Sequence, residues 1–473
     1  MKFPGFIGPS YTLDTDIVGL ERLINQYTQL AESAGARGPK VFVPIPGVTT
    51  LTSVLSNPGR GIFELNGRLF AIIGYQLYEL DDTWTATSRG DVQYSTDPVT
   101  ISGNGDGGNE LFITSNGIGF IYNLLTNTLT NVVTGATMGG FIDGYFIYLD
   151  TSTSKVYCSE LFDGLTWDPG QVSQRNAAAD KFDSMLIARR EIWLFGNKTS
   201  EVWYNSGETF PFKPIPGAMF EFGIAARWSA AELGYTPVWL GQNKDGDSMV
   251  LRGVGYNAQR ISNHGVERAI DSYSTKSDAI AWTYSDRGHS FYVLTFPTAE
   301  ATWVFDDSTQ EWHERAYWDV ATSQFTAYRP QFHAHAFGTH VVLDRSNGNV
   351  YSLDRTSYSD VDGAVIRRVR RAPYLQDENK PIIVNRVEVE FNQGDAVLSG
   401  QGSEPIAMMN MAPDARVFKA LPDVSVAPRG EYNGPRMIWR RCGRGTRASF
   451  ELVLTDPIPW HIVDASIDVV VGK

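Results

Sequence analysis

The sequence contains few cysteines, and their placement excludes two kinds of small, cross-linked domain. Only Cys158 and Cys442 occur among 473 residues, far apart and in no Cys-x-x-Cys pair. A disulfide framework or a structural zinc site needs more cysteines at closer spacing. Lone thiols are typical of proteins that assemble in a reducing cytoplasm, so we expect assembly there.

Long apolar runs are also missing. The opening segment, MKFPGFIGPSYTLDTD, has a single lysine followed by proline and glycine, where a secretory signal needs an apolar run. No stretch of the sequence is apolar over the length that a bilayer requires. We therefore expect a soluble protein with no membrane insertion.

Positive charge is scarce relative to negative charge, and the formal charge is −13 at pH 7. Affinity for phosphate comes mainly from Lys and Arg side chains that displace counterions. A protein that grips nucleic acid over its whole surface is therefore disfavoured. A channel through which DNA slides has the opposite requirement, because a basic wall would hold the DNA. The acidity is compatible with a conduit and unfavourable for a clamp.

The common catalytic and nucleotide-binding signatures do not occur. There is no G-x-x-x-x-G-K-[ST], no G-x-S-x-G and no H-E-x-x-H. The glycine-rich segment 103–108 precedes no expected helix that could offer an anion site, so it predicts a flexible loop. We expect neither enzyme activity nor a cofactor.

Three histidines have a spacing that suggests a metal site. His333 and His335 would share one face of a strand, and His340 follows closely. No carboxylate or thiolate accompanies them at ligand spacing. Packed or surface histidines are the preferred interpretation, and we expect no metal.

The composition favours β structure, because aromatic residues cover pleated surfaces and glycines permit tight turns. The chain has 45 Gly, 25 Phe, 21 Tyr and 12 Trp, and only 20% of its residues are charged. The best helical pattern is DIVGLERLINQYTQLAE, residues 16–32, where apolar residues recur at helical spacing. This periodicity predicts a helix there, although Gly19 weakens it.

Residues 56–360 repeat a hairpin pattern. An apolar run ends in Asn-Gly or Asp-Gly and a second apolar run follows, as in IFEL-NG-RLFAII, FITS-NG-IGFIY, GGFI-DG-YFIYLD and VVLDRS-NG-NVYSLD. These dipeptides tolerate the left-handed conformations of the turns that join paired strands. The recurrence at roughly 40 residues matches a propeller blade. We expect an all-β fold with a β-propeller of about six or seven blades; unrelated hairpins of a large β-sandwich are the alternative.

A second domain is expected at residues 361–473. Val387, Val389 and Phe391 alternate with Glu388 and Glu390, the pattern of a strand with one buried face. Prolines break the middle of the segment into loops. This predicts a separate β-sandwich-like domain.

Arginine is concentrated at two places in this domain, and such clusters can mark contacts with phosphate or with an acidic partner subunit. The alternative is a solvated strand face with ordinary ion pairs. The candidate interface residues are Arg367, Arg368, Arg370, Arg371, Arg440, Arg441, Arg444 and Arg447.

Three long segments resemble one family. They are residues 21–51, residues 157–224, which include DGLTWDP, EIWLFGNKTSEVWYNSG and FPFKPIPGAMFEFGI, and residues 428–469. The chain resembles the tail nozzle proteins, also called tail hub or packaged-DNA-stabilisation proteins, of short-tailed phages. The motif residues that we expect to be structural are Asp163, Gly164, Trp167, Trp193, Gly196, Glu201, Trp203 and Tyr204. In this resemblance residues 16–32 belong to an extended arm instead of a helix.

The resemblance implies a structural virion protein of the phage tail, assembled in the host cytoplasm. Six copies would form a ring below the portal and its adaptor ring, extend the DNA channel, help retain the packaged genome and conduct DNA during ejection. The implied partners are other copies of the chain, the adaptor ring protein, distal fibre, spike or needle proteins, and double-stranded DNA in passage. Residues 1–55 would form an N-terminal arm packed against the C-terminal, Arg-rich platform domain, and both would face and bind the adaptor. The propeller would form the outer body.

Two other functions are compatible with a propeller. Residues 286–291, DRGHSF, partly resemble the Asp-box turn of sialidases, so a glycosidase or depolymerase is one alternative. A carbohydrate-binding tail adhesin is another, because the twelve Trp residues could stack on sugars. Most of these Trp residues fall in expected strands, where core packing is the simpler explanation.

Overall fold

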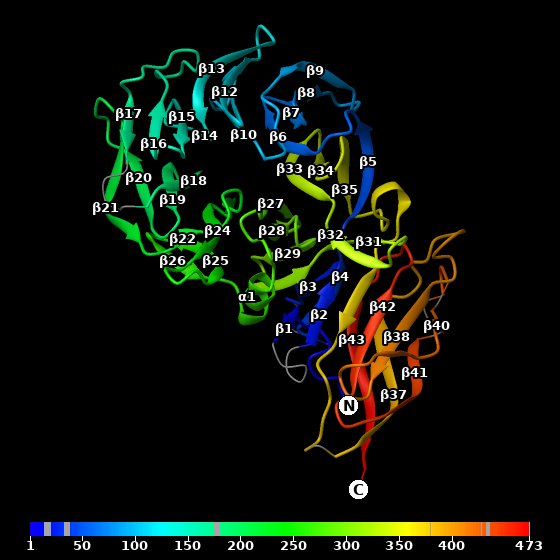
Figure 1. The fold of residues 1–473 in the computed structure, drawn as a ribbon. Helices are drawn as coiled ribbons and strands as arrows, with labels where there is room; N and C mark the ends of the chain where they lie inside the picture. Colours follow the sequence, from blue (N-terminus) through cyan, green and yellow to red (C-terminus); the bar gives the residue numbers. More distant parts are fainter. Residues whose placement is uncertain are drawn as a thin grey trace.

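A computed structural model describes residues 1–13, 20–32, 38–174, 180–378, 380–426, 428–431 and 436–472 of the chain. A ring of β-sheets forms one end of the molecule and an elongated β-sandwich, which holds both termini, forms the other (Figure 1). The described residues contain one α-helix, α1 (His264–Asp271), and one 3-10 turn, Val361–Gly363. Among them no helix has the length and apolar character to cross a membrane. The all-β prediction is confirmed.

Seven sheets form the propeller, which agrees with the predicted six or seven blades. The first three blades are β6 (Gly59–Leu65), β7 (Arg68–Ile73), β8 (Gln76–Leu80) and β9 (Ala86–Asp91); β10 (Thr100–Gly103), β11 (Glu110–Ser115), β12 (Gly117–Asn123) and β13 (Thr128–Ala136); and β14 (Met138–Ile142), β15 (Tyr145–Asp150), β16 (Lys155–Cys158) and β17 (Val172–Gln174). The next three are β18 (Phe182–Ala188), β19 (Glu191–Gly196), β20 (Ser200–Asn205) and β21 (Phe212–Phe220); β22 (Gly223–Ile224), β23 (Ala231–Leu233), β24 (Thr236–Gln242), β25 (Ser248–Val254) and β26 (Asn257–Arg260); and β27 (Ile280–Asp286), β28 (His289–Phe296), β29 (Ala301–Asp306) and β30 (Glu311–Glu314).

The seventh blade closes the ring with a strand from the start of the chain. Its first three strands are β33 (Pro330–Ala336), β34 (Thr339–Asp344) and β35 (Asn349–Asp354), and its fourth is β5 (Gly47–Ser53). β5 pairs antiparallel with β35, so the two ends of the propeller sequence share one sheet. The short hairpin β31 (Ala316–Asp319) and β32 (Gln324–Ala327) lies between the sixth and seventh blades in the chain.

The predicted turn dipeptides explain three of these hairpins directly. Asn66-Gly67, Asn116-Gly117 and Asp143-Gly144 all have positive φ, as type I′ turns require. The fourth pair differs, because Gly348 does not have a positive φ. A Cβ there would lie 1.6 Å from the Leu55 carbonyl oxygen, so glycine is needed for the close approach of the chain that follows β5.

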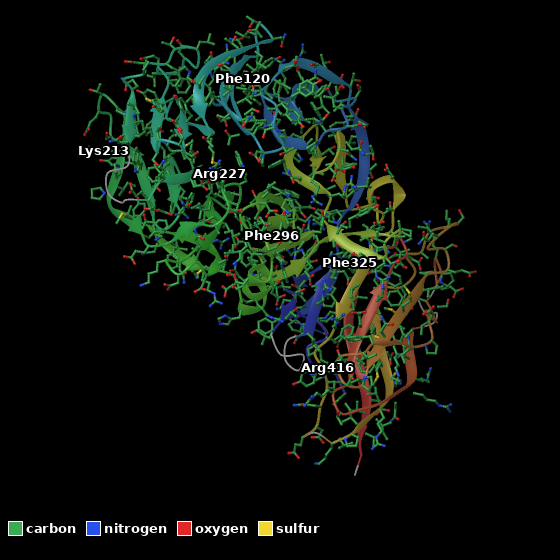
Figure 2. All side chains as sticks on the ribbon, viewed as in Figure 1. Phe120, Lys213, Arg227, Phe296, Phe325 and Arg416 are labelled. Atoms are coloured by element: carbon green, nitrogen blue, oxygen red, sulfur yellow. The ribbon has the colours of Figure 1, made fainter. Side chains whose placement is uncertain are left out.

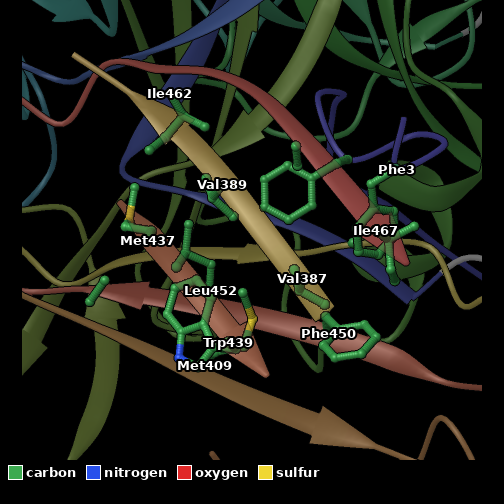
Figure 3. Packing of buried hydrophobic residues seen from close by; sticks show 14 of the residues in the cluster. Phe3, Val387, Val389, Met409, Met437, Trp439, Phe450, Leu452, Ile462 and Ile467 are labelled. Carbon is green, nitrogen blue, oxygen red and sulfur yellow. The ribbon is translucent and has the colours of Figure 1, made fainter. Parts of the chain in front are cut away.

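Two sheets form the sandwich. The first contains β3 (Gln26–Leu30), β4 (Lys40–Pro44), β43 (Ile462–Val471), β37 (Ile382–Phe391) and β41 (Met437–Gly445). The second contains β1 (Tyr11–Thr12), β2 (Leu20–Ile24), β36 (Arg368–Arg371), β42 (Ser449–Leu454), β38 (Ile406–Ala412), β39 (Lys419–Ala420) and β40 (Val424–Ser425). Their facing side chains, including Phe3 from the N-terminus, form one apolar core (Figure 3).

The predicted helix at residues 16–32 is wrong where the structure describes it. β2 and β3 occupy this stretch, and Asn25, with φ 58°, turns the chain between them. All side chains from Leu23 to Thr28 are buried, so this segment has no polar face that a surface helix would need. Its backbone hydrogen bonds are formed by strand pairing in two sheets instead. Residues 16–19 lie outside the described part.

β2 joins the two halves of the molecule. Its Ile24 pairs in parallel with Glu314 of β30 in the sixth blade, and its other edge pairs with β36 of the sandwich. One sheet therefore runs from the propeller into the sandwich. Asn25 fixes this joint with side-chain hydrogen bonds to the carbonyls of Ala316 (2.8 Å) and Arg367 (2.9 Å) and from the Ala316 amide (2.9 Å).

The seam between the last and first blades gives a test of the closure. Gly59 of β6 leaves no room for a side chain, because a Cβ would lie 2.3 Å from the Leu343 Cβ. Gly59→Ala is expected to lower the free energy of unfolding by about 1–3 kcal/mol through overpacking. Urea unfolding followed by tryptophan fluorescence measures the change. Ser53→Ala, at an exposed site on β5, is the control and should change the free energy of unfolding by less than about 0.5 kcal/mol. Equal losses of stability in the two variants would contradict a tightly packed seam.

Candidate functional site

The first arginine cluster lies largely inside the molecule. The Arg370 side chain is 1% exposed and donates to the carbonyl oxygens of Gly5 (2.7 Å), Phe6 (2.6 Å) and Gly8 (2.9 Å). Burial lowers the pKa of Arg370 to about 10. This guanidinium therefore holds the N-terminal segment against the sandwich. It cannot contact a partner, so its assignment to an interface is wrong.

The other three members of that cluster also have internal contacts. Arg368 is fully buried and donates to the carbonyls of Ile366 (3.2 Å) and Tyr358 (3.3 Å), so it too is not an interface residue. The Arg367 guanidinium stacks 4.3 Å from the ring centroid of Trp318 in β31. Arg371 forms an ion pair with Glu451 (2.6 Å). The Arg367–Trp318 contact lies at the junction of the two domains, whereas the Arg371–Glu451 pair joins two strands of the sandwich.

The second cluster lies on a surface. Arg440, Arg441 and Arg444 are exposed on β41, the edge strand of the first sandwich sheet, and their side chains form no hydrogen bond or ion pair with any described residue. Arg447 is half-buried, and its Nε has no partner among the described residues. Arg441 has φ 54° and interrupts the regular strand. Three of the eight candidates are thus free to bind a partner.

The strand register places apolar side chains beside these arginines. Arg440 pairs with Arg386 on β37, and Arg444 pairs with Ile383, whose other neighbour is Val470. The residues Ile383 and Val470 are 41% and 51% exposed. We call the surface formed by Arg440, Arg441 and Arg444 together with Ile383 and Val470 the arginine face. It lies on the half of the sandwich farther from the propeller (Figure 1). An apolar centre with a rim of free cations suits an acidic protein surface.

Charge is divided unequally between the two ends of the molecule. Residues 51–358 contain 21 Lys and Arg against 34 Asp and Glu, and the flanking segments contain 19 of each. The whole formal charge of −13 therefore belongs to the propeller. The sandwich is neutral overall and presents its free arginines at one place. A net negative charge of this size disfavours tight binding of phosphate.

The inner strands of the blades enclose a tunnel. A cavity of about 430 Å³ lies along it, lined mostly by apolar side chains such as Ile62, Ile101, Phe141 and Phe332. This volume is typical of a small-molecule pocket and is far too small for a DNA duplex. DNA cannot pass along the axis of the propeller itself.

The family-motif residues at the third blade form a rigid turn. The Asp163 carboxylate accepts hydrogen bonds from the Leu165 amide (2.9 Å) and the Thr166 hydroxyl (2.7 Å), and the Thr166 bond above all lowers the pKa of Asp163. Gly164 donates to Glu110 of the second blade (3.0 Å). Trp167 donates from Nε1 to the Gly164 carbonyl (2.7 Å). These contacts hold two blades together.

The motif residues of the fourth blade are packed. Trp193 and Trp203 are 1% and 0% exposed, and Glu201, which is 2% exposed, accepts a hydrogen bond from the Trp203 indole (3.1 Å). The buried Gly196 ends β19, and Tyr204 lies under the Lys213 ammonium, 5.9 Å from its ring centroid. Their placement agrees with a structural role.

The three histidines meet on the β33–β34 hairpin. His333 Nε2 lies 2.9 Å from His340 Nδ1, and the rings of His335 and His340 are 5.1 Å apart. Burial lowers the pKa of His333 to about 3, so this ring is neutral. Across the described ranges, no group of three or more His, Cys, Asp or Glu has the geometry to hold a metal. His333 is largely packed, His340 is half-buried and His335 is exposed.

The turn that resembles an Asp box is also structural. Arg287 (φ 49°) and Gly288 (φ 83°) form the tight connection between β27 and β28, and Asp286 pairs with Arg355.

Sequence reasoning missed the buried arginines of the fold, including Arg60 and Arg315, which are 1% and 0% exposed. Nothing in the local sequence separates them from surface arginines, because their acceptors come from distant segments.

The two arginine clusters give contrasting predictions for stability. Arg370→Met leaves several buried carbonyl oxygens without a donor, and each such group costs about 1–3 kcal/mol. We expect the free energy of unfolding to fall by at least about 3 kcal/mol and amide exchange of residues 1–9 to accelerate. Arg440→Met, on the exposed face, is the control and should change neither quantity. Slow exchange of residues 1–9 in Arg370→Met would contradict this role.

Comparison with solved structures finds propellers of low similarity. The N-terminal domain of Nup159 is 10% identical, with a TM-score of 0.43, and the match covers 70% of this chain and 98% of that one. Virginiamycin B lyase from Staphylococcus aureus is 10% identical, with a TM-score of 0.42, over 64% of this chain and 97% of that one. None of the curated protein sequences compared with the chain matches it.

Two family models match almost the whole chain. The model described as bacteriophage P22 Gp10, beta-propeller, matches residues 21–358, and the model described as bacteriophage P22 Gp10, beta-sandwich, matches residues 367–470. These boundaries coincide with the ring of blades and with most of the sandwich, and the resemblance to tail nozzle proteins is confirmed. The chain therefore belongs to the bacteriophage P22 Gp10 family of phage-stabilising tail proteins, and it is a structural protein of the virion.

Proposed function

We propose that six copies of this chain form the nozzle of a phage tail, a ring below the portal and its adaptor ring. The ring extends the DNA channel, helps to retain the packaged genome and conducts DNA during ejection. Its partners are its own neighbouring copies, the adaptor ring protein and distal fibre, spike or needle proteins. Assembly takes place in the host cytoplasm before DNA is released through the tail.

The observation that carries this proposal is the separation of free cations from net negative charge. The arginine face has unpaired guanidinium groups around exposed Ile383 and Val470, at an end of the molecule away from the acidic propeller. Such a face suits a protein partner better than DNA, because apolar contacts complement a protein surface and not a phosphate backbone. We place the sandwich and the N-terminal segment at the adaptor and the propeller on the outer body.

The channel of the proposed ring runs between subunits. The tunnel within one propeller cannot hold a duplex, so DNA is confined by the outer surfaces of several propellers or sandwiches. Residues 51–358 have an excess of 13 acidic side chains, 34 against 21, in each copy. Walls of this charge do not bind phosphate strongly, which allows DNA to slide.

This function requires no bond to be made or broken. Asp286, in the turn that partly resembles an Asp box, pairs with Arg355, and Asp163 is held in a turn by hydrogen bonds. No observation at these sites favours a glycosidase or depolymerase over a structural role. Release of reducing ends from host polysaccharide by the purified chain would favour the enzyme instead.

Charge reversal of the arginine face tests the docking direction. The triple variant Arg440→Glu, Arg441→Glu and Arg444→Glu is expected to lose binding to portal–adaptor complexes, because like charges would meet an acidic partner surface. Co-sedimentation with purified portal–adaptor complexes measures binding. The melting temperature should stay within a few degrees of the wild type, since all three side chains are exposed.

The matched control reverses three exposed cations of the propeller, Lys198, Lys244 and Arg287. It adds the same negative charge to the chain but leaves the arginine face intact, so docking should be preserved. Normal docking by the arginine-face variant, or equal loss in both variants, would contradict the assignment.

Removal of the protein tests genome retention. Particles that are packaged in the absence of this chain are expected to lose DNA, because the channel ends at the adaptor without its extension. DNase-sensitive DNA per particle measures the loss, and addition of purified chain to fresh particles should restore protection. Stable, fully packaged particles that lack the chain would contradict the proposed role.

A further inference from the structure

The tunnel of the propeller opens at one end into a larger polar mouth. This mouth has a volume of about 620 Å³ and is lined by loops and strand ends of six of the seven blades. The narrower tunnel cavity and the mouth share two residues, Pro98 and Trp228, so the Trp228 side chain lies at their boundary. Arg227, beside it, lies on the inner side of the ring of blades (Figure 2). The volume falls within the range of about 300–1,000 Å³ that is typical of ligand sites.

The polar groups of the mouth are held in place by the fold. The buried Arg60 donates to the carbonyls of Gly74 (2.8 Å), Gln93 (3.1 Å) and Asp97 (2.6 Å), which fixes the loop before β10. Arg227 donates to the Asp183 carboxylate (2.5 Å), and its own carbonyl accepts from Ser184 (2.8 Å). A ligand would therefore meet groups that are already oriented.

Two carboxylates in the mouth have unused hydrogen-bonding capacity. Asp278 accepts from the Thr298 amide through Oδ2 (2.7 Å), whereas its Oδ1 is buried and has no partner among the described residues. The exposed Asp97 carboxylate accepts no hydrogen bond from any described residue, although it interacts electrostatically with the buried Arg60. A buried acceptor without a donor is costly, so a bound ligand that supplies donors would gain affinity here.

The charges of the mouth exclude anionic ligands. Its two arginines are neutralised, Arg227 by Asp183 (2.5 Å) and Arg345 by Glu300 (2.9 Å). The buried Arg60 is partly balanced by Asp97, and Asp278 forms no ion pair with any described residue, so the carboxylates outnumber the cations and disfavour a phosphate or carboxylate ligand. The two carboxylate–arginine pairs present acceptors and donors side by side, which matches hydroxyl groups, since each hydroxyl both donates and accepts.

We propose that this mouth is a binding site for a neutral saccharide. The Trp228 ring provides an aromatic surface for the apolar C–H face of a sugar, and Asp278 and Asp97 accept from its hydroxyls. The tunnel beneath Trp228, lined by Ile62, Ile101 and Phe332, admits a small apolar substituent. Sugars with a methyl group, N-acetylhexosamines and 6-deoxyhexoses, are therefore preferred. This site is independent of the nozzle proposal, because it uses none of the residues of the arginine face.

Ligand-observed NMR and calorimetry on the purified full chain test the site. The probes are tri-N-acetylchitotriose, a rhamnose trisaccharide, maltotriose and sialyllactose. At least one of the two methyl-bearing trisaccharides is expected to bind, maltotriose more weakly, and the anionic sialyllactose not at all. Trp228→Ala and Asp278→Asn should each weaken binding by about tenfold or more, since each removes one anchoring contact.

Asp278→Asn keeps the shape of the side chain, so it remains informative if Trp228→Ala fails to fold. Asp82→Asn, an exposed carboxylate away from the mouth, is the matched control and should bind like the wild type. Absence of binding by all three neutral sugars at about 10 mM, unchanged affinity in Asp278→Asn, or preference for sialyllactose would overturn the proposal. Equal binding of maltotriose would overturn the role of the tunnel.

Discussion

The segment from Leu20 to Ser53 is the constraint on which both halves of the structure depend. β2 joins a propeller blade to a sandwich sheet, β3 and β4 enter the other sandwich sheet, and β5 closes the propeller. Asn25 makes this possible, because its positive φ turns the chain from one sheet to the other and its side chain binds Ala316 and Arg367. Neither half can complete its sheets without these strands, whose partners lie roughly 290 or more residues later. Such long-range pairing is slow to form and favours assembly of the two halves as one unit.

The buried arginines are a second consequence of this arrangement. A segment that crosses from one sheet to another leaves carbonyl groups that no strand can pair, and a guanidinium has five donors with which to satisfy them. Arg370 binds the carbonyls of the N-terminal segment, and Arg60 binds those of the loop before β10. Carbonyl oxygens compensate a buried cation only in part, which is why burial lowers the pKa of both residues to about 10. These arginines stabilise connections between distant segments and do not form a binding surface.

Local patterns in the sequence predicted local structure well. The Asn-Gly and Asp-Gly dipeptides marked hairpins, and the alternation from Val387 to Phe391 marked a strand with one buried face. The family resemblance was carried by long co-linear segments, and the fold that it implied is present. The helix expected at residues 16–32 failed because helical spacing of apolar residues also fits two short strands that are buried on both sides. Likewise, the sequence could not separate Arg370 from Arg440, because burial depends on the N-terminal segment and that contact spans 360 or more residues.

The geometry of the blades also limits how a ring of these chains can handle DNA. In the proposed hexamer the axis of each seven-bladed propeller is a narrow, apolar tunnel and not the DNA path. The propeller therefore contributes its outer surface and its acidic charge to the channel, while the continuous β30–β2–β36 sheet transmits forces between propeller and sandwich without a flexible linker. A force on the propeller from distal tail parts would pass through these paired strands into the second sandwich sheet, and from there across the apolar core to the sheet that carries the arginine face. A rigid connection of this kind suits a part that must stay docked while DNA under pressure is retained above it.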